Sequence, residues 1–176
     1  MLNCKISKGV QAQCDTSIGG IMRLAFANFS KDHVFTNASG DCEVDSIALA
    51  SGEKAYEVSF LDGTGLAEVE LNVGDSTDQK NFTHRITMNL QKLDCDLLEQ
   101  YKNWSLGHLI AFVQQKDGNV YVYGADNGLA ATSFNYTSGS QAGDANGITA
   151  IFEGVQLDAP LKLESWDLVK ALYPSA

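Results

Sequence analysis

The stretch from Phe82 to Val155 constrains the fold most, because it predicts a nearly complete series of elements belonging to one architecture. An alternating apolar and polar run indicates a strand with one buried face, and a helix follows it over about 94–105. Three further strands are predicted after the helix, and glycine-rich sequence precedes the last of them: Leu109–Gln114, Val120–Gly124 and Ile148–Leu157. Catalytic sequence signatures are absent from this series. Such a chain is more typical of a building block than of an enzyme.

The helix is predicted from its ends as well as from its periodicity. Asp94 is a suitable N-cap, and Leu93 before it is placed to pack against Leu98. Gly107 is well placed to end the helix. The apolar stripe that we expect to pack on the sheet consists of Leu97, Leu98, Tyr101 and Trp104.

The sequence pattern predicts four strands in the first half of the chain. Ile21–Phe29 and Glu43–Ala50 are predicted strands. The second is expected to contain a bulge, because the alternation of its apolar residues shifts by one position between Val44 and Ile47. Tyr56–Phe60 and Val69–Val73 alternate on either side of Asp62–Gly65, which predicts a hairpin. In this interpretation the apolar side chains of the hairpin are buried, and the solvent-facing side carries Glu57, Glu68 and Glu70.

Two predicted strands are apolar on both faces and therefore need cover on both. In Val120–Gly124 the large side chains include Tyr121 and Tyr123, and in Ile148–Leu157 the face opposite the core carries Ile151 and Val155. Either the helix or another subunit can supply the second cover, so we treat these four residues as candidates for a subunit interface. After Pro160, Leu163–Leu172 has the spacing of a short amphipathic helix.

Composition narrows the class of protein. The chain of 176 residues is predicted to form a single β-rich domain over 1–176, and its net charge of −10 disfavours sequence-specific binding to nucleic acid. The start of the chain lacks an apolar core of signal-peptide length, and we expect synthesis in a cytosol. The four cysteines are most simply free thiols, with a Cys4–Cys14 bridge as the alternative.

Candidate sites for chemistry are weak. The three histidines lie far apart in the sequence, and a metal site that combines His33, Cys42 and His84 has little support from spacing. Asp75–Asp78 resembles half of a calcium loop but lacks its glycine and final glutamate. We therefore predict no catalytic, metal or cofactor site, and no enzymatic activity.

The order of elements resembles that of small tail proteins of tailed bacteriophages, in particular tail-tube and tail-ring virion proteins of phages that infect Bacteroides-like hosts. The resemblance is carried by three segments and by the helix with its neighbouring strands, which together cover about half of the chain. The three segments are Gly118–Gly124, Asn127–Gly128 and Gly143–Gly154. The resemblance implies an antiparallel β-barrel or sandwich with one flanking helix. It also implies self-assembly into a hexameric or twelvefold ring.

In this family-based interpretation the protein belongs to the virion tail, after synthesis in the host cytoplasm. Its partners are copies of itself and other tail or neck proteins, genomic DNA passes through the ring without sequence-specific binding, and no membrane is involved. An acidic channel wall would keep DNA from adhering, so Glu57, Glu68 and Glu70 are predicted to face the channel. The sequence does not separate tail tube, tail terminator and neck or ring adaptor.

The alternative is a monomeric β-sandwich that binds a carbohydrate or a protein partner. It requires an exposed aromatic side chain, and the candidates are Trp104, Tyr121, Tyr123 and Trp166.

Overall fold

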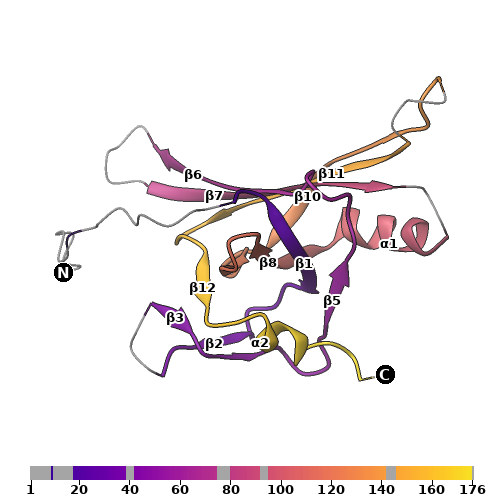
Figure 1. Cartoon of the computed structure of the whole chain (residues 1–176). Coiled ribbons are helices and arrows are strands. Elements are labelled where there is room, and N and C mark those ends of the chain that lie inside the picture. Colours follow the sequence, from indigo (N-terminus) through magenta and orange to yellow (C-terminus); the bar gives the residue numbers. More distant parts are fainter. Residues whose placement is uncertain are drawn as a thin grey trace.

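The computed structural model of the chain describes residue 9 and residues 18–38, 42–74, 80–91, 95–141 and 146–175. Figure 1 shows its elements in chain order. Within the described residues these are β1 (Ile21–Asn28), β2 (Val34–Thr36), β3 (Glu43–Val44), β4 (Ser46–Ala48), β5 (Ala55–Val58), β6 (Leu66–Val73), β7 (Lys80–Gln91), α1 (Cys95–Leu106), β8 (His108–Gln115), β9 (Val120–Tyr123), β10 (Leu129–Thr137), β11 (Gly147–Gln156), β12 (Leu161–Leu163) and α2 (Asp167–Lys170).

Ten strands form one sheet that branches at β8. One edge of β8 pairs with β1, and the other edge pairs with β9 over Ala111–Gln114 and with β10 at its start. We call β5–β1–β8–β9–β12–β3 the central wing and β10–β11–β7–β6 the outer wing. In Figure 1 the outer wing crosses the top of the molecule, and the β2–β4 ribbon and α2 lie at the bottom.

The first hydrophobic core lies between the two wings. Its largest fully buried side chains come from strands of both wings, including Leu24, Ile86, Met88 and Phe152. The outer wing therefore turns one face toward the core, as the alternation in β7 and β11 predicts. Its other face points away from the core and is mostly polar.

A second core covers the opposite face of the central wing. Phe112 and Val122 point into it and meet Trp166 and Val169 from the C-terminal segment, together with apolar residues of the β2–β4 ribbon. The central wing is thus buried on both faces by the same chain. This confirms the expectation that the strand beginning at Val120, which is β9, is covered on both faces.

The expectation of a β-rich fold is confirmed, but a closed barrel is wrong. The sheet is open and mixed: β6 ends the strand order, and β3 pairs with β12 in parallel. A barrel would require β6 to find a partner at the other end of the sheet. The described strands leave its second edge unpaired.

The predicted hairpin is also wrong. β5 pairs with β1, whereas β6 pairs with β7, so the two strands belong to different wings. The Asp62–Gly65 segment is a crossing between the wings, and the backbone N–H of Leu61 donates to the carbonyl of Asn89 at 2.9 Å. Gly65 is required here, because a Cβ would come within 2.6 Å of the ring of Phe60.

Two other predicted elements are divided in the structure. Glu43–Ala50 breaks at Asp45 into β3 and β4, which pair with different strands, so a single bulged strand is wrong. Asp45 explains the break, since its carboxylate accepts the N–H of Ala38 at 2.9 Å and its own N–H donates to Thr36. Leu163–Leu172 begins at the end of β12 and contains only the short α2, although Leu163, Trp166 and Val169 are buried as the predicted stripe requires.

The predicted helix is confirmed as α1, which ends at Leu106 directly before Gly107. The expected capping residues Leu93 and Asp94 lie outside the described residues, as do Cys4, Cys14 and most of the 74–80 loop. Leu97, Tyr101 and Trp104 pack against the first core, but none of them is fully buried, and Leu98 is 52% exposed. The helix therefore rests on the sheet with much of its surface open.

Candidate assembly surface

β6 is the most exposed long strand of the molecule. None of its eight residues is buried, and four apolar side chains are between 40% and 56% exposed: Leu66, Val69, Leu71 and Val73. The last three alternate along the core-facing side of the sheet, where the outer wing extends past the core (Figure 1). The strand contains no lysine, no proline and no irregularity in its pairing with β7, which are common devices that blunt a sheet edge.

The other face of β6 is acidic. Glu68 lies opposite Arg85 on β7, with Oε2 and Nη1 4.0 Å apart, and Arg85 Nε donates to Glu153 of β11 at 2.8 Å. The contact with Glu153 raises the pKa of the Arg85 guanidinium. Together with Glu70, this face holds three carboxylates against one guanidinium, so it is net negative.

The three acidic residues predicted to share one surface do not lie together. Glu68 and Glu70 share the face of β6 that points away from the core, whereas Glu57 lies on β5 in the central wing. Its carboxylate accepts the hydroxyl of Tyr173 at 3.3 Å. Burial and the neighbouring Glu57 raise the pKa of Tyr173 to about 12, so this hydroxyl remains a donor at neutral pH.

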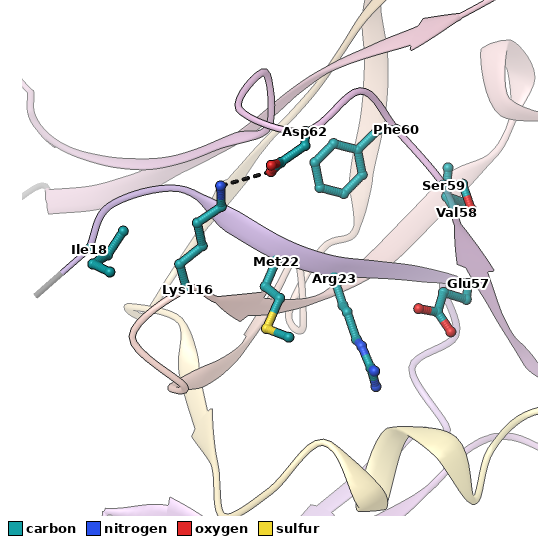
Figure 2. Close-up of a pocket in the computed structure, with 9 residues that line it drawn as sticks. All are labelled: Ile18, Met22, Arg23, Glu57, Val58, Ser59, Phe60, Asp62 and Lys116. Carbon is teal, nitrogen blue, oxygen red and sulfur yellow. Dashed lines mark ion pairs between the residues drawn. The ribbon is translucent and has the colours of Figure 1, made fainter.

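Figure 2 shows Glu57 at the rim of a hollow of about 610 Å³ between β1, β5 and the crossing segment. Arg23 of β1 faces the same hollow and points toward α2. An ion pair of 2.8 Å between Lys116 and Asp62 spans its other end, and it lowers the pKa of Asp62. Positive and negative groups are mixed here, and the ion pair fastens the crossing segment to the β8–β9 turn.

The four predicted interface residues differ in exposure. Tyr123 is 4% exposed and meets the ring of His84 edge to face, while Tyr121 is half-buried against the first core. Ile151 is half-buried on the outward face of β11, and Val155 is 52% exposed there. Tyr123 is therefore closed to a partner, Val155 offers the most surface of the four, and β6 is the edge that the sequence did not indicate.

A groove of about 1280 Å³ lies between α1 and the β1–β5 pair. One wall is the apolar side of α1, with Leu97 and Trp104, and the other is Tyr56–Ser59 along β5. Of the four aromatic residues considered for ligand binding, Trp104 lines this groove, whereas Trp166 is buried in the second core. The groove depends on where α1 lies relative to β5, which no local sequence pattern encodes.

Two of the three histidines, His33 and His84, hold loops and strands together. His33 bridges two loops, with Nε2 2.8 Å from the carbonyl of Asn28 and Nδ1 accepting the N–H of Ala50. His84 is buried, and the described residues contain no group of three His, Cys, Asp or Glu side chains that would hold a metal ion. His33, Cys42 and His84, the one combination of possible metal ligands considered from the sequence, do not form such a group, and Asp75–Asp78 lies outside the described residues.

A buried amide organises the β9–β10 turn, and the sequence analysis missed it. Gln156 accepts the N–H groups of Asp126 and Asn127 at 3.0 Å and donates to the carbonyl of Gly128 at 2.9 Å. An isolated glutamine in an apolar strand gives no sign of such a role, because its partners are 28 to 30 residues away.

Neither helix in the described part of the chain has the length and hydropathy needed to span a membrane. Comparisons with family models, curated proteins and solved structures found no match for this chain.

Proposed function

We propose that this protein is a structural subunit of a phage virion that assembles with its own copies into rings of the tail. In this proposal it forms the tail tube or a tail or neck ring, acts alongside other tail proteins, surrounds the channel that conducts DNA, and catalyses no reaction. The proposal rests on the resemblance described above and on the exposed edge of β6. Its site of action would be the virion.

The edge of β6 is the observation that carries the proposal. An unpaired strand presents a row of backbone donors and acceptors, and a long apolar edge is a template for pairing with another chain. β6 adds exposed Val69, Leu71 and Val73 to that row. Pairing with a neighbouring copy would satisfy the backbone groups and bury these side chains.

Charge favours a ring over a twofold dimer. If β6 paired with β6 of a second copy, Glu68 and Glu70 of both copies would be brought close together, which is unfavourable. Pairing of β6 with a different surface of the next copy avoids this repulsion. Such head-to-tail contacts generate closed rings when the rotation between copies closes.

The outward face of the outer wing is the better candidate for a channel wall. It carries Glu68, Glu70 and Glu153, with only Arg85 to offset them. Negative potential would repel DNA phosphates and let the duplex slide. Glu57 lies in the other wing, beside Arg23 in the hollow of Figure 2, and would reach the same channel only if assembly brought that hollow to the wall.

The proposal is tested by placing a charge on the edge. Val69→Lys should reduce self-association strongly, because the lysine must then be buried beside the new strand. Leu98→Lys is the matched control, since Leu98 is similarly exposed but lies on α1. Sedimentation over a concentration series and negative-stain electron microscopy would measure ring formation.

Rings that form equally well with both variants would show that β6 is not the contact. A wild-type chain that stays monomeric at every concentration and in the presence of its virion partners would contradict assembly itself. The alternative, a monomeric binding module, is favoured by one feature, the groove beside Trp104.

A further inference from the structure

β10 forms a second open edge of the outer wing. Among the described strands it pairs with β8 at Leu129 and Ala130, and beyond these two residues it lies beside β11 alone. Its pairing with β11 is regular over residues 133–137, where the β10–β11 ribbon extends past the rest of the molecule (Figure 1). Every second residue there directs its backbone N–H and carbonyl away from β11, and no other described strand meets these groups.

The directions of the strands allow β6 of one copy to pair with β10 of another. Each neighbouring pair in the order β10–β11–β7–β6 is antiparallel. Because four strands alternate in direction, β6 and β10 run in opposite directions. A second copy in the same orientation therefore presents its β10 antiparallel to β6 of the first copy, and the alternation continues from one copy to the next.

The core-facing sides of the two edges are both apolar. On β6 this side exposes Val69, Leu71 and Val73. On β10 it carries Phe134, whose ring packs against the first core, and two residues further Tyr136, which is 49% exposed. Pairing of the edges would place these side chains beside one another on one side of the sheet.

The outward sides of the two edges are compatible in charge. β6 carries Glu68 and Glu70 on this side, whereas residues 133–137 of β10 contain no charged side chain. The repulsion that opposes pairing of β6 with β6 is therefore absent from a β6–β10 contact.

Other strands at the edges of the described sheets fit β6 less well. β5 has four residues, carries Glu57, and already donates the N–H of Ala55 to the carbonyl of Leu172. β3 has two residues and also carries a carboxylate, that of Glu43. The strands of the β2–β4 ribbon have three residues each. The free stretch of β10 is longer than any of these.

The two edges are also offset in a way that suits a closed ring. β6 lies along positions 80–87 of β7, whereas residues 133–137 of β10 lie, through β11, level with positions 87–91. The centres of the edges therefore differ by about five residues, which is about 17 Å along the strands against about 19 Å across four strands. Pairing the edges at their centres inclines the strands by roughly 40° to the ring axis, within the tilt that closed sheets adopt.

We propose, on the basis of the ring assembly proposed above, that β6 of each copy pairs antiparallel with residues 133–137 of β10 in the next copy. The outer wings then form one continuous sheet around the ring. Val69, Leu71 and Val73 pack beside Phe134 and Tyr136 of the neighbour, and the acidic side chains of all copies share the opposite face.

The first test places a charge on the β10 edge of the full chain. Tyr136→Lys should raise the concentration needed for ring formation about tenfold or more, because the ammonium group must enter an apolar contact. Tyr56→Lys is the matched control, since Tyr56 is 57% exposed on β5, and it should assemble as the wild type does. Sedimentation over a concentration series measures both.

The second test mixes two chains that each keep one intact edge. Val69→Lys retains its β10 edge and Tyr136→Lys retains its β6 edge, so each variant alone should stay monomeric. An equimolar mixture should form dimers and nothing larger, because one β6–β10 contact can form and neither remaining edge can extend it. A chain with both substitutions should remain monomeric in either mixture.

The third test follows the backbone of the wild-type chain and does not depend on a variant. Hydrogen exchange of rings and of dilute subunits should show protection gained in β6 and in residues 133–137, because pairing occupies their free N–H groups. β5 should exchange at the same rate in both.

Rings of Tyr136→Lys at the wild-type concentration, or unchanged exchange in residues 133–137, would overturn the pairing with β10. If Val69→Lys still prevents assembly in that case, the ring proposal stands and β6 has another partner. Dimers of Tyr136→Lys alone would instead indicate that β6 pairs with β6. A wild-type chain that never assembles contradicts both proposals.

Discussion

β6 and β8 are strands of the same sheet and the same length, yet one is almost wholly exposed and the other almost wholly buried. β8 has strands along both edges and a core against each face, while β6 has one neighbour and lies where the sheet has passed the end of the core. Both contain several large apolar side chains. The difference shows that apolar content sets what a strand can bury, and its place in the sheet decides what it does bury.

The largest expected effect separates the two strands directly. Phe112→Ala on β8 removes a side chain that is 0% exposed, and it should lower the free energy of unfolding by about 3–5 kcal/mol. Leu71→Ala on β6 removes a half-exposed side chain and should change it by no more than about 0.5 kcal/mol in the monomer. Urea denaturation of both variants measures the difference, and similar losses would break the comparison.

An intermediate effect is expected where the wings meet, at His84. Its Nδ1 accepts the N–H of Gly124 at 3.3 Å and its Nε2 donates to the carbonyl of Asp158 at 3.0 Å. His84→Ala leaves both groups without this partner and should cost about 1–3 kcal/mol. Urea denaturation at neutral pH measures this cost, and His108→Ala, at an exposed site, is the control.

The same residue gives the stability a defined pH dependence. Burial lowers the pKa of His84 below its ordinary value of 6.5, so the unfolded chain takes up a proton before the folded protein does. The contribution to stability is therefore complete above pH 6.5 and is lost as the pH falls to the lower pKa of the folded state. As the pH falls through this range, the urea midpoint of unfolding should decrease in the wild type and should change less in His84→Ala. Parallel curves would refute this assignment.

The smallest effect is expected on the outward face of the outer wing. Arg85→Gln removes the contacts with Glu153 and Glu68, but these groups are partly exposed, so the loss of stability should be small and should decrease with added salt. Denaturation at low and high salt measures it. A loss as large as that of Phe112→Ala would mean that this exposed network stabilises the outer wing as strongly as a core does.

The sequence predicted most elements, because alternation and caps are local. β1, β7, α1, β8, β9 and β11 lie within a few residues of their predicted ranges. Strand pairing was predicted less well. The alternation in Tyr56–Phe60 and Val69–Val73 shows which residues share a face, but it does not identify the neighbouring strand, and the turn residues Asp62–Gly65 suit a crossing as well as a hairpin.

Burial on β6 could not be predicted for a related reason. Val69, Leu71 and Val73 alternate as buried residues do, yet the described chain leaves each of them between 40% and 56% exposed. The groove beside Trp104 and the role of Gln156 depend on contacts between distant segments. Short elements such as β2 and β12 contain too few residues for any period to be recognised.

The branch at β8 has a consequence for how the chain tolerates change. β1 pairs with one edge of this strand, while β9 and β10 share the other edge. The registers of three neighbouring strands therefore depend on the same eight residues. Inserting a single amino acid there would invert the side chains of everything downstream in the strand and misalign both wings at once. A change in the length of this strand should therefore disturb the fold more than the same change in a strand that has one neighbour, such as β6.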